Sequence, residues 1–256
     1  MECKICGFKT DYYFKKNILG KYDVTYYRCK HCGLIQTEKP FWLKEAYSSA
    51  IIDSDTGILS RNIALSKITA IICLLLLNKN SKVLDYGGGY GILTRLLRDI
   101  GMDCYWTDKY AENIFAKGFE DKNISKYDMV TAFELFEHLE NPVEELVNIF
   151  GKFQPQVLLF STVLHKGTPS KNWWYFVPEG GQHITLYTKK SLEIIAERLG
   201  LKLSTNNNDI HILSKKKFST IMMYIISVFF PFYSMFYSHI FKSKTTPDHK
   251  FLGKKI

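Results

Sequence analysis

Four cysteines near the start of the chain have the spacing of a metal site. Two Cys-x-x-Cys pairs, separated by 22 residues, are formed by Cys3, Cys6, Cys29 and Cys32. The two-residue gap lets one tight turn aim both thiolates at a single ion, and two such pairs complete a tetrahedral site with no open position. A segment of about 40 residues is too small to hold a core unaided. The pattern therefore predicts structural zinc, or iron in its place, over a redox dithiol or disulfides.

A glycine-rich turn, VLDYGGGYG, follows a short apolar segment. Asp85 precedes three glycines with a period of two, Gly87, Gly89 and Gly91. Glycines there permit positive φ and let the backbone approach a ligand at the N-terminus of the next helix. A dinucleotide fingerprint that starts at Gly87 needs glycine at position 92, where Ile92 stands, so NAD is disfavoured. A P-loop is excluded because no Gly-Lys-Ser/Thr follows.

The segment FELFEHL places two acids and a histidine close together. Offsets of three and four bring Glu134, Glu137 and His138 within reach of one centre if a helical turn begins there. One interpretation is that the three residues hold a divalent ion. The other is that Glu137 and His138 cap the next helix and line a pocket, with acid or base duty. The sequence leaves both open.

The segment NWWYFVPEGGQHITLYT combines aromatic residues with a Pro-Glu-Gly-Gly turn. Long loops in a compact domain are often functional, and aromatic faces suit sugar rings. His183 comes just before ITLYT, and the ordinary pKa of histidine suits the removal of a proton from a hydroxyl. We expect His183, His138 and Glu137 to be the catalytic residues.

The elements that must position these residues alternate along the chain. Strands are predicted at 82–86, 103–108, 127–133, 156–162, 201–206 and 209–215, and helices at 92–101, 110–117, 142–153 and 189–200. Such alternation predicts an α/β fold, with a mostly parallel sheet covered on both faces and an antiparallel pair at the end. Ligands bind beyond the carboxyl ends of such strands, which is where the glycine turn and FELFEHL fall.

The motif DYGGGYG resembles motif I, D/E-x-G-x-G-x-G, of the class I S-adenosylmethionine-dependent methyltransferases. By element order the resemblance spans roughly residues 45–213. It implies a Rossmann-like, seven-stranded sheet, and a ribose-binding acid at Asp108. The cofactor-binding residues that it implies are Asp85, Gly87, Gly89, Gly91, Asp108 and Glu134. Some small-molecule members hold a divalent ion with acids and histidine at the spacing of Glu134, Glu137 and His138.

The resemblance departs from the family between Asp108 and Lys126. The family places a helix, a strand and another helix there, and only 18 residues are present. We predict a shortened adenine wall, formed by GFE at 118–120.

The net charge of +9 is concentrated in the tail. Eight lysines and one acid lie beyond residue 214, so the rest of the chain carries only two of these charges. The apolar segment 218–242 contains Pro231, so we expect helices folded on the body or peripheral contact with an anionic membrane, not a crossing. No signal peptide is visible. We expect a cytoplasmic protein, at the inner face of the membrane if the tail makes that contact.

Three parts are predicted: a zinc-knuckle module (1–40), a methyltransferase domain (41–213) and a basic, apolar helical tail (214–256). The combination resembles bacterial methyltransferases associated with sugars and cell-surface glycans. It implies methyl transfer to a hydroxyl, or a carbon, of a sugar-type or lipid-linked glycan acceptor. An RNA base methyltransferase is the first alternative, and the lack of a basic stripe on the body disfavours nucleic acid. A non-catalytic cofactor-binding scaffold is the second, against which the intact glycine turn and Asp108 argue.

Overall fold

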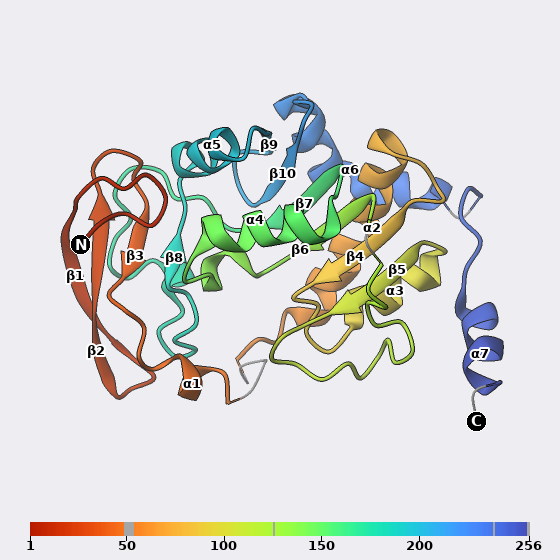
Figure 1. Cartoon of the computed structure of the whole chain (residues 1–256), viewed down its shortest axis with the longest axis horizontal. Helices are drawn as coiled ribbons and strands as arrows, with labels where there is room; N and C mark the ends of the chain where they lie inside the picture. The colour runs from red at the N-terminus through yellow and green to blue at the C-terminus, as the bar shows by residue number, and fades with distance from the viewer. Residues whose placement is uncertain (49–53, 125, 238, 255–256) are drawn as a thin grey trace.

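A computed structural model of the chain describes residues 1–48, 54–124, 126–237 and 239–254. It contains a four-stranded sheet near the N-terminus and a six-stranded sheet at the centre (Figure 1). The C-terminal helix lies at the opposite end of the molecule from the N-terminal sheet.

The central sheet has the strand order β5-β4-β6-β7-β10-β9. Its strands are β4 (Lys82–Tyr86), β5 (Asp103–Thr107), β6 (Met129–Ala132), β7 (Val157–Ser161), β9 (Lys202–Thr205) and β10 (Ile210–Ser214). Strands β4 to β7 are parallel, and β10 runs antiparallel to both of its neighbours. This confirms the mixed sheet, in which the central strands β6, β7 and β10 are buried along their whole length.

The predicted number of seven strands is wrong, because the described residues form six in this sheet. The segment after Asp108 is too short for a further strand between two helices. One bridge joins Trp106 of β5 to Glu120, and the Trp106 N–H donates to the Phe119 carbonyl at 2.8 Å. The GFE segment therefore covers the edge of β5 with a single bridge.

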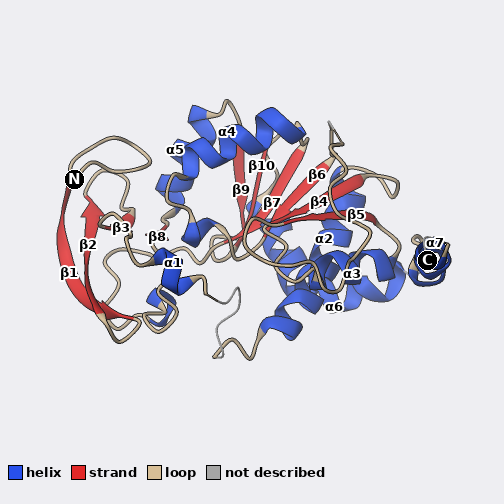
Figure 2. Cartoon of the chain, turned by 60° about the horizontal axis from the view of Figure 1, so that its bottom comes forward, coloured by secondary structure: helices blue, strands red, loops and turns tan. Residues whose placement is uncertain are grey.

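Helices cover both faces of this sheet (Figure 2). One face carries α4 (Pro142–Phe153) and α5 (Lys189–Arg198), and the other carries α2 (Ile58–Leu76), α3 (Ile92–Ile100) and α6 (Thr220–Tyr237). Within the described ranges only α2 is long and apolar enough to cross a membrane. Nearly half of α2 is buried, and it packs against α3 and α6, as a core helix does.

The N-terminal sheet is antiparallel and includes a strand from far along the chain. It has the order β1-β2-β3-β8, with β1 (Thr10–Ile18), β2 (Tyr22–Cys29), β3 (Ile35–Thr37) and β8 (Thr185–Leu186), and the short helix α1 (Leu43–Ala46) follows it. Its core contains Phe14, Tyr26 and Trp42 together with Phe176 of the aromatic loop. The N-terminal sheet is therefore completed by residues that follow β7.

The tail forms two helices. Helix α6 continues through Pro231, and α7 (Thr245–Gly253) follows. Met223 and Ile226 of α6 are buried in the same core as α2. Helix α7 is tied to α3 by an ion pair between Asp248 and Arg98.

Candidate active site

The glycine turn joins β4 to α3 with the backbone that a close ligand needs. Gly89 has φ +52, and no atom lies within 4 Å of the place where a Cβ would stand. Gly91, with φ +85, precedes α3, and a Cβ there would stand 2.6 Å from Asn113 Oδ1. Gly89 therefore presents open backbone, whereas Gly91 is required by packing.

Asp85 is buried beneath this turn. Its carboxylate accepts hydrogen bonds from the Thr94 hydroxyl at 3.0 Å and the Thr131 hydroxyl at 3.1 Å. Burial raises the pKa of Asp85 to about 6, although the two hydroxyls favour the ionised form. Asp85 is not among the residues that line the neighbouring cavity, so its carboxylate braces the turn from below.

Asp108 lies at the end of β5 and fixes the opposite side of the turn. One carboxylate oxygen accepts the Gly89 N–H at 2.9 Å, and the other accepts the N–H groups of Tyr110 and Ala111 at 2.7 Å. A carboxylate has about four acceptor positions, so one is left for a ligand hydroxyl. The predicted ribose acid and glycine turn are thus in contact.

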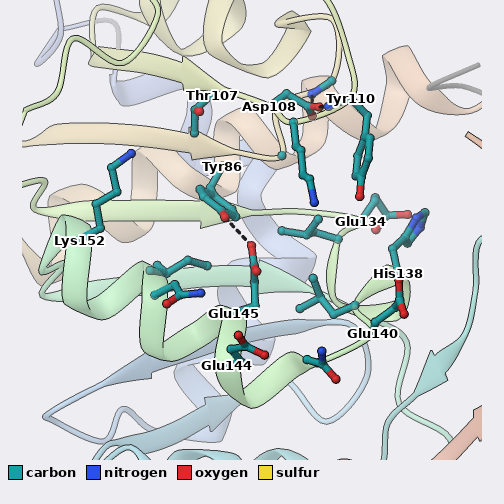
Figure 3. Close-up of a pocket in the computed structure, with 18 of the residues that line it drawn as sticks. Tyr86, Thr107, Asp108, Tyr110, Glu134, His138, Glu140, Glu144, Glu145 and Lys152 are labelled. Atoms are coloured by element: carbon teal, nitrogen blue, oxygen red, sulfur yellow. Dashed lines mark hydrogen bonds between the residues drawn. The ribbon is translucent and has the colours of Figure 1, made fainter. Parts of the chain in front are cut away.

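A cavity of about 1080 Å³ opens at this end of the sheet (Figure 3). Of the predicted cofactor residues, Gly87, Gly89, Asp108 and Glu134 line it, and Asp85 and Gly91 do not. The volume is sufficient for a nucleoside with an amino-acid chain and for part of an acceptor.

Glu134 follows β6 in a strained backbone conformation. Its φ is +51, its N–H donates to the Ser161 hydroxyl at 2.8 Å, and that hydroxyl donates to its carboxylate at 2.6 Å. Arg61 lies 3.4 Å from the other oxygen. The Glu134 side chain is 40% exposed, on the side that faces the cavity. The protein packed around the rest of it, followed by repulsion from Glu137, raises the pKa of its carboxyl group. A positive φ is unfavourable for a residue other than glycine, and here the hydrogen bonds to Ser161, at the end of β7, stabilise it.

Glu137 is fully buried in the 3-10 turn Phe136–His138. Neither carboxylate oxygen has a hydrogen bond to the described part of the chain. The hydroxyls of Thr162 and Tyr175 lie nearby and favour the ionised form of Glu137. These two hydroxyls are 3.4 Å apart and can bond each other. Burial raises the pKa of Glu137 to about 7.

His138 and His183 come together from distant segments. His138 Nδ1 lies 2.9 Å from the Tyr47 hydroxyl, and His183 Nδ1 lies 2.7 Å from the Tyr175 carbonyl. Burial lowers the pKa of both imidazoles, so both are neutral near pH 7. Their ring centres are 5.0 Å apart, and a ligand atom from each lies within 4.8 Å of the Glu137 carboxylate.

The three predicted catalytic residues are therefore neighbours. The predicted metal set of Glu134, Glu137 and His138 is not the set that the structure brings together, because His183 takes the third place and Glu134 bonds Ser161 instead.

A family model described as a methyltransferase domain matches residues 61–206, more than half of the chain. The chain belongs to this methyltransferase family. The prediction of a methyltransferase is therefore confirmed at the level of the family. No curated protein matches the methyltransferase in sequence.

Solved structures agree with this fold. The 1,6-didemethyltoxoflavin-N1-methyltransferase of Burkholderia thailandensis, solved with S-adenosylhomocysteine, is 13% identical with a TM-score of 0.50, over 74% of this chain and 93% of that one. The plantazolicin methyltransferase BpumL is 12% identical with a TM-score of 0.49, over 68% and 90%. CalO1, a methyltransferase of calicheamicin biosynthesis, is 15% identical with a TM-score of 0.44, over 62% and 56%. The methyltransferase thus spans just over half of CalO1, and at these identities the likeness concerns the fold alone.

Several site residues were missed by sequence reasoning. Tyr47 contacts His138, and Tyr175 contacts His183. Glu134 is held by both Arg61 and Ser161. Tyr47 and Arg61 come from a segment that carries no motif. Ser161 lies in a predicted strand and Tyr175 in the aromatic loop, but nothing local marks either as a partner of the site.

The four cysteines of the N-terminal pairs form one cluster. Sγ–Sγ distances are 3.5 Å for Cys3 and Cys32, 3.5 Å for Cys6 and Cys29, and 3.6 Å for Cys6 and Cys32. Four thiolates about 2.3 Å from a zinc ion stand roughly 3.8 Å apart in a tetrahedron. All the cysteines are free thiols, so the cluster has the donors and the spacing of a four-cysteine zinc site.

This cluster is connected to the loop that carries His183. The Thr188 hydroxyl caps α5 and donates to the Cys32 carbonyl at 2.5 Å. Earlier in the loop, the Trp42 indole N–H donates to the Gly181 carbonyl at 2.8 Å, and β3 pairs with β8. The N-terminal module therefore forms the support on which His183 is placed.

Proposed function

We propose that this methyltransferase moves the methyl group of S-adenosylmethionine to a hydroxyl oxygen of a sugar-type acceptor that is carried by a lipid. The observation that carries the proposal is the cluster of Glu137, His138 and His183 beside the cavity of Gly89 and Asp108. The neutral imidazole of His183 donates from Nδ1 to the Tyr175 carbonyl, so its Nε2 keeps a lone pair for the hydrogen of a hydroxyl.

The cofactor ribose would face Asp108, with the sulfonium toward Glu134. The acceptor hydroxyl loses its proton to His183 Nε2, and its oxygen forms a bond to the methyl carbon. The electron pair of the broken C–S bond returns to sulfur, and S-adenosylhomocysteine leaves. Most of the rate enhancement comes from alignment of oxygen, carbon and sulfur.

A sugar-type acceptor is supported by aromatic side chains at the cavity. Tyr47 and Tyr110 both line it and stack with ring centres 4.8 Å apart. Such faces suit the apolar side of a sugar ring. The acids Glu140, Glu144 and Glu145 also line the cavity and disfavour a polyanion such as RNA.

A lipid surface is supported by the outer side of α6. Exposed apolar residues recur there at offsets of three and four: Ile221, Tyr224, Ile225, Val228, Phe229 and Phe232. Lys215, Lys216 and Lys217 precede the helix, and Lys242 and Lys244 follow it. An apolar stripe between basic clusters suits anionic phospholipid.

A second cavity lies beside α6, and among the described residues it shares no lining residue with the main cavity. It has a volume of about 380 Å³, and Arg61, Tyr224 and Val228 are among its lining residues. Arg61 also pairs with Glu134 of the main cavity at 3.4 Å. A lipid-carried acceptor on α6 would therefore lie near the reacting groups. The four cysteines would hold zinc, which supports the loop of His183 and takes no part in the reaction.

The test is transfer of labelled methyl groups from S-adenosylmethionine to three acceptor pools: a lipid-linked glycan extract, water-soluble nucleotide sugars and RNA. We expect label in the lipid-linked glycan, at an oxygen. His183→Ala should lower turnover by about 100-fold or more while cofactor affinity stays the same. Label only in RNA, or unchanged turnover in His183→Ala, would contradict the proposal.

A further inference from the structure

The cluster of Glu137, His138 and His183 has features that a proton-transfer site does not require. Glu137 and His138 stand on the 3-10 turn after β6, and His183 stands just before β8. One ligand atom from each lies within 4.8 Å of the others. Three potential metal ligands therefore converge from two segments that are held by different sheets.

Both imidazoles are oriented by their Nδ1 atoms. The Tyr175 carbonyl can only accept, so His183 Nδ1 carries the hydrogen of that 2.7 Å bond and Nε2 keeps its lone pair. His138 Nδ1 bonds the Tyr47 hydroxyl at 2.9 Å, which leaves its Nε2 as the second nitrogen. Histidines that bind metals are commonly fixed in this way, by a carbonyl or another polar group at the opposite nitrogen.

Glu137 supplies the second, independent observation. Its side chain is fully buried, and neither oxygen has a hydrogen bond within the described residues. Arg61 is the neighbouring protein cation, and its guanidinium is engaged by Asp55 at 2.7 Å and by Glu134 at 3.4 Å. A buried carboxylate without a hydrogen bond is costly unless a cation compensates it.

We propose that a divalent transition-metal ion binds the Glu137 carboxylate and the Nε2 atoms of His138 and His183. Two imidazoles and one carboxylate suit Mn²⁺, Fe²⁺ or Zn²⁺ better than Mg²⁺ or Ca²⁺, which prefer oxygen ligands. Of the three ligands only His138 is among the residues that line the main cavity, so an acceptor would reach the ion from the side of His138. Two neighbouring hydroxyls of a sugar would fill two of the remaining coordination positions.

This inference rests on the proposed function and changes one step of it. The acceptor hydroxyl bound to the ion is more acidic than a free hydroxyl. Its proton passes to the Glu134 carboxylate, which lines the same cavity, and His183 serves as a ligand. The oxygen then forms its bond to the methyl carbon, and the C–S electron pair stays with sulfur as before.

The experiment measures Mn²⁺ binding apart from catalysis. Protein with one zinc per chain at the cysteines is freed of other metals by a chelator and titrated with Mn²⁺, followed by the loss of the free-ion electron paramagnetic resonance signal. We expect one Mn²⁺ per chain, with at least tenfold weaker binding in both Glu137→Gln and His183→Ala. Glu144→Gln, which removes a charge from the same cavity, should bind Mn²⁺ like the wild type.

Absence of Mn²⁺ binding, or wild-type binding in Glu137→Gln, would overturn the inference. Circular dichroism and cofactor calorimetry on the same samples establish that each variant is folded and still binds S-adenosylmethionine. If the wild type binds Mn²⁺ but not the cofactor, the proposed function fails and the metal site stands. If it binds the cofactor but not Mn²⁺, the metal site fails and His183 remains the base.

Discussion

Arg98 of α3 and Asp248 of α7 form a two-pronged ion pair across 150 residues of sequence. Nε and Nη2 of Arg98 donate to the two oxygens of Asp248 at distances of 2.7 Å, and both side chains are only 6% exposed. The Arg98 guanidinium also lies 3.6 Å from the centre of the Phe119 ring. The C-terminal helix thereby holds GFE, the segment that we predict to form a shortened adenine wall.

Removal of this pair should weaken both the fold and the cofactor site. Asp248→Asn leaves a buried guanidinium with one charged partner fewer, so we expect the free energy of unfolding to fall by about 3 kcal/mol. Cofactor affinity should fall as well, because Phe119 loses its support. Urea denaturation and calorimetry measure the two effects. Glu112→Gln, in an exposed pair with Lys117, is the matched control and should change neither.

The Arg98–Asp248 ion pair should make the free energy of unfolding depend on pH in the acid range. Burial alone would raise the pKa of Asp248, but the hydrogen bonds from Arg98 and Arg95 outweigh it and hold that pKa below its ordinary value. A lowered folded-state pKa contributes stability above the unfolded value of about 3.9, which is lost as the pH falls through the folded value. The stability difference between wild type and Asp248→Asn should be constant at neutral pH and shrink below about pH 4. A difference that grows in acid would refute this origin.

Asp108→Ala should abolish most cofactor binding. The substitution removes the acceptor of the Gly89 N–H and the position left for a ribose hydroxyl. Loss of one hydrogen bond to a charged group corresponds to at least a tenfold weaker affinity. Calorimetry with S-adenosylhomocysteine is the measurement, and Asp11→Ala, in an exposed ion pair with Lys30 of the N-terminal module, is the control. Equal affinity in wild type and Asp108→Ala would contradict the placement of the cofactor.

Loss of the proposed zinc ion from the four cysteines should lower turnover, because the N-terminal module supports the loop that carries His183. In Cys29→Ser with Cys32→Ser, the N-terminal module would no longer bind the proposed zinc ion, and Thr188 and β8 would lose their support. We expect turnover to fall by about tenfold or more while S-adenosylhomocysteine affinity changes less than about threefold. Zinc content by mass spectrometry accompanies both measurements. Cys73→Ser, a buried thiol on α2, should retain zinc. Full turnover in the zinc-free variant would contradict a supporting role.

The apolar side of α6 should bind anionic vesicles. Phe229→Asp with Phe232→Asp removes two exposed rings and adds negative charge, so co-sedimentation with phosphatidylglycerol vesicles should fall at least tenfold. Val147→Asp, at an exposed apolar position on α4, is the matched control. If the wild type sedimented equally with neutral and anionic vesicles, the basic clusters would have no role in binding. If it sedimented with neither, α6 would not be a membrane-binding surface.

The sequence alone determined the features that are local. The period-two glycines of 87–91, the cysteine spacing and the alternation of apolar segments each act within a few residues, so the turn, the cysteine cluster and the six strands follow from them. The family resemblance implies a seventh strand, but the short gap after Asp108 leaves too little chain for it. A strand count depends on the length of chain available, and resemblance does not lengthen it.

Only the tertiary structure decided which side chains meet. His183 joins Glu137 and His138 because the next residue, Ile184, donates its backbone N–H to the Glu137 carbonyl at 2.9 Å, a contact between distant segments that no local pattern encodes. For the same reason Arg61 reaches Glu134, Tyr47 reaches His138 and Asp248 reaches Arg98. Such contacts depend on how packed elements bring distant segments together, whereas a sequence motif reports only the conformation of its own neighbourhood.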